Sequence, residues 1–192
     1  MKTKYILLLT FLITLISCKE ETEVREIEQQ KEAQKREVIY QNISKNWTFT
    51  IRPVDGSTQS KVNSWIEWRA FLNEINQKPQ KTIGEFQKKA DALTKKVDEL
   101  NLKIPEQFNK PQVRGRIAVI STKIKMMDLF IHLNKIPDAK VVDFIKDINV
   151  EILALQQQLE EIVRRTQIPK EVGEPEIIRI QDTTRAIPDS PF

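Results

Sequence analysis

The fold of this 192-residue chain is decided by residues 111–169, PQVRGRIAVISTKIKMMDLFIHLNKIPDAKVVDFIKDINVEILALQQQLEEIVRRTQIP. Apolar side chains recur there at alternating steps of three and four, first over residues 113–131 and again over residues 141–162. This spacing places them along one face of a helix, with a repeat of about seven residues. Pro111 suits the first turn of the first helix, and Pro137 separates the two helices. Because the link over residues 135–137 is so short, we expect the two helices to form an antiparallel hairpin.

Two segments nearer the N-terminus carry similar patterns. Thr82-Ile83-Gly84-Glu85 has the form of a capping box, and an apolar repeat follows it as far as Pro105. Residues 58–77 repeat apolar side chains at the same spacing and predict one helix that ends before Pro79. Together these patterns predict an all-α fold, an antiparallel three- to four-helix bundle over residues 57–169.

Residues 46–56 follow a different period. Trp47, Phe49 and Ile51 alternate with threonines, and the alternation ends at Pro53. One interpretation is a short strand that pairs with residues 176–180. The other is an extended segment that presses its aromatic side chains onto the helical body. We favour the second, because the chain offers no other strand to pair with.

The first residues have the pattern of an export signal. Basic residues precede an apolar run over residues 5–16, which is too short to cross a bilayer as a helix. The run ends in Leu15-Ile16-Ser17-Cys18, which resembles the lipobox of bacterial lipoproteins. The resemblance implies that residues 1–17 are a signal peptide and that Cys18, the one cysteine of the chain, receives the lipid. The alternatives are an ordinary signal peptide with a chance cysteine, or a buried thiol.

Charged residues dominate the segment that follows Cys18. Lys19-Glu20-Glu21 resembles the export signal of surface lipoproteins in the Bacteroidota, which implies attachment to the outer membrane, with the cell surface favoured over the periplasmic side. Residues 19–37 contain few large apolar side chains, so we expect residues 18–45 to form a solvated, partly helical tether.

The C-terminal residues 170–192 are interrupted by prolines and predict a flexible tail. Asp182-Thr183-Thr184 within this tail resembles the O-glycosylation motif of Bacteroidota envelope proteins. The resemblance makes Thr183 the candidate acceptor.

The composition argues against most enzyme chemistry. One cysteine and one histidine exclude an intramolecular disulfide and a histidine-rich metal site, and four scattered glycines form no phosphate-binding loop. We expect His132, among apolar neighbours near a helix end, to be packed or capping. Asp143, Asp147 and Glu151 are spaced by four, which favours a solvated or ion-paired face over a cation site. The sequence therefore predicts no catalytic residue, no metal and no cofactor.

One candidate surface is basic. Arg114, Arg116, Lys123 and Lys125 lie in a stretch without acids and could attract anionic lipids or an acidic partner. Nucleic acid is disfavoured because no aromatic side chain is interleaved with these charges. The favoured alternative is that they pair internally with the acids of the last helix.

Another candidate surface is aromatic. Trp65 and Trp68 lie three residues apart, so they share a helix face. We expect both in the core, with a carbohydrate or protein platform as the alternative. Met126 and Met127 are likewise expected to fill the core.

These features predict a non-enzymatic, lipid-anchored envelope protein that serves as a structural or interaction subunit of an outer-membrane assembly. Its expected partners are the membrane, through the anchor, and an envelope protein, with neither nucleic acid nor a small-molecule substrate. The alternatives are a binding module for glycans or anionic envelope lipids, and a holdase-like envelope chaperone.

Overall fold

The computed structural model describes the backbone of residues 2–168 and the side chains of residues 24–168. Its helices are α1 (Lys2–Asn46), α2 (Gly56–Val62), α3 (Ile66–Asn76), α4 (Ile83–Leu102), the short 3-10 helix η1 (Glu106–Phe108), α5 (Pro111–Ile131) and α6 (Asp138–Gln167). The described residues contain no strand, which confirms the all-α prediction. The predicted tail, with Thr183 and residues 176–180, lies outside the described residues.

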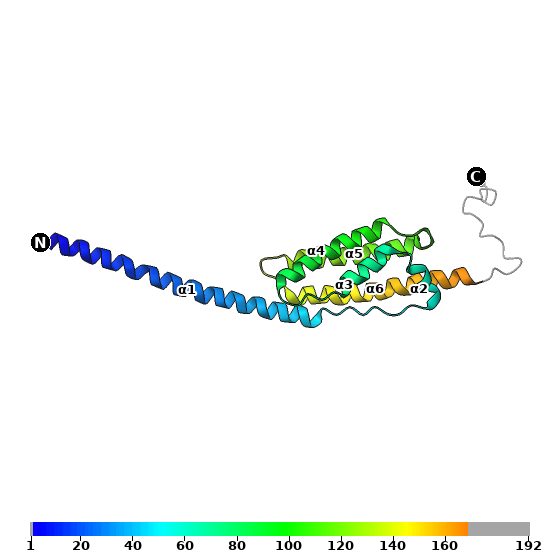
Figure 1. Cartoon of the computed structure of the whole chain (residues 1–192), viewed down its shortest axis with the longest axis horizontal. Helices are drawn as coiled ribbons and strands as arrows, with labels where there is room; N and C mark the ends of the chain where they lie inside the picture. Colours follow the sequence, from blue (N-terminus) through cyan, green and yellow to red (C-terminus); the bar gives the residue numbers. More distant parts are fainter. Residues whose placement is uncertain (1, 169–192) are drawn as a thin grey trace, which may run out of the picture.

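The bundle is organised around α5, which packs against both α4 and α6, while α3 packs on α4 (Figure 1). The seven-residue repeats of the sequence become the core, and nearly all of their side chains are fully buried. Burial of this kind contributes about 1.5–3 kcal/mol for each large apolar side chain. The predicted hairpin of α5 and α6 and the antiparallel bundle are confirmed.

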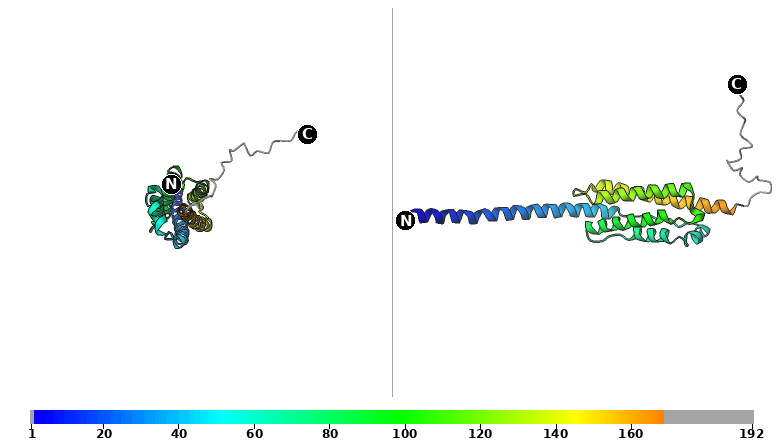
Figure 2. Two further views of the ribbon diagram at one scale, coloured as in Figure 1. Left: turned by 90° about the vertical axis from the view of Figure 1, so that its right-hand side faces the viewer. Right: turned by 90° about the horizontal axis from the view of Figure 1, so that it is seen from above.

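Helix α1 is a rod that projects from the bundle (Figures 1 and 2). At about 1.5 Å per residue, its 45 residues span roughly 68 Å. Every side chain from Val24 to Val38 is exposed. Ile39, Tyr40 and Ile43 instead pack against the core, and Asn42 Nδ2 donates to Asp138 Oδ2 over 2.6 Å. The predicted tether is therefore continuously helical, and its last turns belong to the bundle.

The prediction of a single helix over residues 58–77 is wrong, because the chain bends between α2 and α3. The bend is closed by the Trp65 N–H, which donates to the Val62 carbonyl over 3.0 Å. Helix α2 packs on α6, whereas α3 packs on α4. A straight helix cannot bury one apolar face against both neighbours, so the change of direction allows Val62 and Trp68 to enter the same core.

Residues 47–55, here called the strap, run alongside α6 in extended form (Figure 1). The Asn149 side chain accepts from Thr50 N over 2.9 Å and donates to Thr48 O over 2.7 Å. Gln156 makes the equivalent pair with the backbone of Arg52. Side-chain amides of α6 thus supply the hydrogen bonds that a neighbouring strand would supply, and the favoured extended interpretation is confirmed.

Candidate functional site

The anchor residues predicted from the sequence are Cys18, Lys19, Glu20 and Glu21. They lie on the backbone of α1, but their side chains lie outside the described residues. From Cys18 to Ile39, the helix rises by about 32 Å. A group attached to Cys18 would therefore sit well away from the bundle.

The four basic residues singled out from the sequence are engaged within the bundle. Their contacts are Lys123 Nζ to Asp147 Oδ2 at 2.7 Å, Lys125 Nζ to Asp98 Oδ1 at 2.7 Å, Arg116 Nη1 to Glu151 Oε2 at 4.0 Å, and Arg114 Nε to Asn109 Oδ1 at 2.5 Å. Two of these acids, Asp147 and Glu151, belong to the carboxylates spaced by four on α6. Internal charge pairing, the favoured interpretation, accounts for most of this surface.

The tryptophan pair does not form a platform. The Trp65 side chain is 1% exposed and that of Trp68 is 3% exposed. Trp65 stacks on Phe108 with ring centroids 5.9 Å apart, and Trp68 stacks on Phe71 at 6.0 Å. The alternative of a carbohydrate platform is contradicted for these two residues, because the core covers both rings.

An apolar groove lies between α5 and α6, with a volume of about 440 Å³. Its lining consists of Ala118, Val119, Thr122, Lys123, Met126 and Phe144. Met127 is fully buried as predicted, but the prediction of Met126 as core filler is wrong, because its side chain is 37% exposed at this groove. Val119 and Met126 lie seven residues apart on α5 and are both exposed at this groove, whereas the exposed Leu133 follows the end of the helix.

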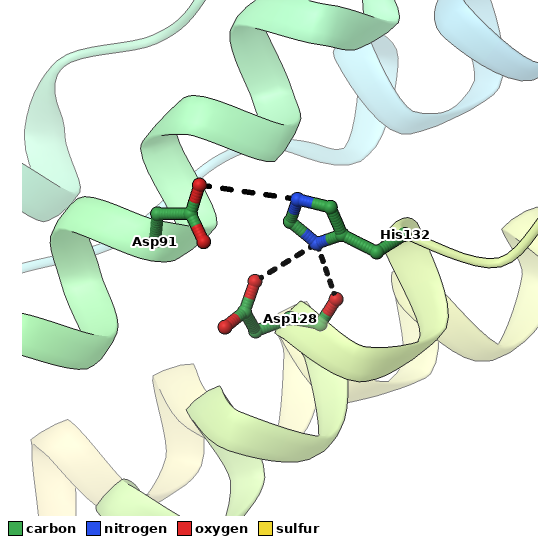
Figure 3. Close-up of side chains that lie close together, drawn as sticks. All are labelled: Asp91, Asp128 and His132. Carbon is green, nitrogen blue, oxygen red and sulfur yellow. Dashed lines mark hydrogen bonds and ion pairs between the residues drawn. The ribbon is translucent and has the colours of Figure 1, made fainter.

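Asp91, Asp128 and His132 form a cluster that the sequence did not predict (Figure 3). Asp91 comes from α4, and the other two residues come from the last turn of α5 and its C-terminal cap. Each residue offers a potential ligand atom within 4.8 Å of the others. Only the spacing of Asp128 and His132 by four was visible in the sequence, because the packing of α4 on α5 brings Asp91 to them.

Contacts to Asp128 hold the His132 ring in place. His132 Nδ1 lies 2.9 Å from the Asp128 carbonyl oxygen and 3.1 Å from Asp128 Oδ1. The ring thus caps the end of α5, as expected for a capping histidine. Asp128 Oδ2 accepts from the Thr94 hydroxyl over 3.2 Å, whereas the buried Oδ1 has no hydrogen-bond donor of suitable geometry.

On the other side of the ring, His132 Nε2 lies 3.9 Å from Asp91 Oδ2. Both side chains reach solvent, since that of His132 is 41% exposed and that of Asp91 is 55% exposed. The arrangement can hold a cation between imidazole and carboxylate. No other group of three or more potential ligands gathers in this way among the described side chains.

Comparison with protein-family models, curated proteins and solved structures finds no match for this chain. None of the described helices is long and apolar enough to span a membrane.

Proposed function

We propose that this protein is a non-enzymatic, lipid-anchored interaction subunit of an outer-membrane assembly. The lipid on Cys18 would hold it at the membrane, and α1 would act as the spacer that carries the bundle. The observation that carries the proposal is the apolar groove between α5 and α6. Apolar side chains exposed in such a groove offer a surface for contact with another protein.

The groove favours one kind of occupant, an amphipathic helix of an envelope protein. Val119 and Met126 lie seven residues apart on α5, the spacing at which one helix packs along another. Phe144 closes one side of the hollow, and Lys123 lies on its lining. A partner helix with its own apolar stripe would bury this face.

The other functions weighed from the sequence have less support. A glycan platform would need the faces of Trp65 and Trp68, which the core covers. Binding of anionic lipids through the basic residues would need to compete with the acids that already contact Lys123 and Lys125. A holdase is distinguished by its many clients, which the experiment below measures.

The anchor is tested separately by replacing Cys18 with serine. We expect the unmodified chain to fractionate with the outer membrane and the Cys18→Ser chain to leave the membrane fraction. Protease treatment of intact cells then determines the side of the membrane. Unchanged membrane association of the Cys18→Ser chain would contradict the lipoprotein assignment.

The groove is tested by photo-crosslinking in the native envelope. A photoreactive amino acid at Val119 should give one discrete adduct with an envelope protein, and Met126→Glu on the same groove should abolish it. Leu102, an exposed apolar residue at the end of α4, provides the matched control position. Equal adducts at Leu102, adducts with another copy of the chain alone, or a broad set of clients would each contradict the proposal.

A further inference from the structure

We propose that Asp91 and His132 form a binding site for a divalent transition-metal ion such as Zn²⁺, with Asp128 as the residue that orients the imidazole. The site does not depend on the interaction function proposed above. It lies at the end of the bundle where α5 turns toward α6 and where α4 packs on α5 (Figure 3).

The contacts of His132 leave the correct ring nitrogen free for a metal. Nδ1 faces two acceptors of Asp128, the carbonyl oxygen at 2.9 Å and Oδ1 at 3.1 Å. The hydrogen bond to the carbonyl oxygen, with the Asp128 carboxylate close by, favours the tautomer that carries its proton on Nδ1. The unprotonated Nε2 then faces Asp91, and neutral imidazole with its second nitrogen hydrogen-bonded in this way is the usual form of a metal-binding histidine.

The position of Asp128 is itself fixed. The Thr94 hydroxyl from α4 donates to Oδ2, which holds the carboxylate across the helix–helix contact. Carboxylates in this position set the orientation of a metal-binding imidazole. We therefore assign Asp128 a positioning role rather than a direct ligand role.

The gap between His132 Nε2 and Asp91 Oδ2 has the size of one ion. Bonds of zinc to imidazole nitrogen and carboxylate oxygen are about 2.0–2.2 Å long, so two such bonds span up to about 4.2 Å. The two atoms are 3.9 Å apart. A small rotation of the exposed Asp91 side chain would close the angle at the metal toward the tetrahedral value, and water would complete the coordination.

The donor set selects the class of metal. Imidazole nitrogen suits Zn²⁺, Cu²⁺ and Ni²⁺, whereas Mg²⁺ and Ca²⁺ prefer sites built from oxygen alone. With a neutral imidazole, the carboxylates of Asp91 and Asp128 give the cluster a negative charge. A bound ion would join α4 to α5 directly, so binding should also stabilise the bundle against heat.

The experiment uses the full-length chain in detergent without a polyhistidine tag. Cys18→Ser is introduced so that the thiol does not compete for metal. ZnCl₂ is titrated by calorimetry, and the ring resonances of the one histidine in the sequence are followed by NMR. We expect one ion per chain, a shift of the imidazole resonances and a higher melting temperature, with no such effects from MgCl₂.

Variants separate the roles of the three residues. His132→Ala and Asp91→Asn should each abolish saturable binding, and both positions are exposed enough for the fold to persist, which circular dichroism checks. Asp128→Asn should weaken binding by about tenfold or more, as loss of an orienting partner does. Asp143→Asn on α6 is the matched control, because this exposed carboxylate lies outside the cluster.

Three results would overturn the proposal. One is the absence of saturable Zn²⁺ binding at submillimolar concentrations. Another is binding of wild-type strength in either the His132→Ala or the Asp91→Asn chain. The third is equal binding by the Asp128→Asn chain, which would remove the positioning role.

Discussion

The side-chain amide of Gln156 forms two hydrogen bonds with the backbone of Arg52. Gln156 Nε2 donates to the Arg52 carbonyl over 2.7 Å, and Gln156 Oε1 accepts from Arg52 N over 3.3 Å. Gln156 is buried on α6 even though glutamine is mostly found exposed. Its burial is explained by the strap, whose polar backbone requires partners at this point.

Replacing Gln156 with leucine should therefore destabilise the bundle. Leucine has a similar volume but leaves the Arg52 N–H and carbonyl without their partners, at a cost of about 1–3 kcal/mol. Chemical denaturation followed by circular dichroism measures the change in the free energy of unfolding. Gln157→Leu on the exposed side of the same helix is the control and should be near neutral. Equal effects of the two substitutions would show that the strap does not depend on this amide.

Trp65 should be among the most sensitive core positions. Its ring fills the space at the bend between α2 and α3 and stacks on Phe108. Trp65→Ala should cost about 3–5 kcal/mol. Trp65→Phe should cost less, because it retains an aromatic ring and removes the indole N–H, which has no hydrogen-bond acceptor. A denaturation series of the three chains provides the measurement, and an equal loss for both variants would contradict the role of ring stacking.

The cap of α2 should give the stability of the protein an acid-dependent component. Asp55 accepts hydrogen bonds from Ser57 and Thr58, and these bonds hold the pKa of its carboxyl well below the ordinary value. Because the folded-state pKa is the lower one, the carboxylate contributes stability above about pH 4, and this contribution is lost as the pH falls further.

The measurement compares the free energy of unfolding of wild type and Asp55→Asn between pH 7 and pH 2.5. We expect a constant difference above about pH 5 and a shrinking one below about pH 4, since asparagine does not titrate. Other carboxylates cancel in this difference. A difference that stays constant over the whole range would show that the cap does not lower the pKa of Asp55.

The exposed part of α1 should be separable from the stability of the bundle. Gln30→Pro removes one helical hydrogen bond and kinks the rod, yet every side chain from Val24 to Val38 is exposed. Spin labels at Glu26→Cys and Lys45→Cys, in a Cys18→Ser chain, should be about 28 Å apart along the intact helix axis. We expect Gln30→Pro to broaden and shorten the measured distances while the melting temperature stays unchanged. A broad distribution, or a distance far from this value, in the chain without the proline would mean that the segment is not a continuous helix in solution.

Much of the fold was visible in the sequence because its signals are local. The seven-residue repeats place Ile117, Ile124 and Ile131 on one face of α5 whatever they pack against. The capping box was equally local, and the Thr82 hydroxyl accepts from Glu85 N over 3.3 Å as predicted. In the other half of the box, Glu85 accepts from the N–H groups of Gln80 and Lys81, because the chain turns back over the helix end.

The apolar groove and the Asp91–His132 pair were less predictable from the sequence than the helices. The apolar groove combines side chains of α5 with Phe144 of α6, so the spacing of Val119 and Met126 in the sequence did not reveal it. Asp91 and His132 belong to different helices, and no sequence spacing relates them. The bend at Trp65 likewise follows from two different neighbours, α6 for α2 and α4 for α3.

The sequence by itself determined which segments are helical and which face of each is buried, because hydrophobic periodicity and capping act over one or two turns of chain. Only the tertiary structure decided which helices meet, where a helix must break to cover two neighbours, and that a carboxylate of α4 faces the one imidazole. Those outcomes depend on how complete side-chain surfaces fit together, and such a fit involves residues far apart in the chain.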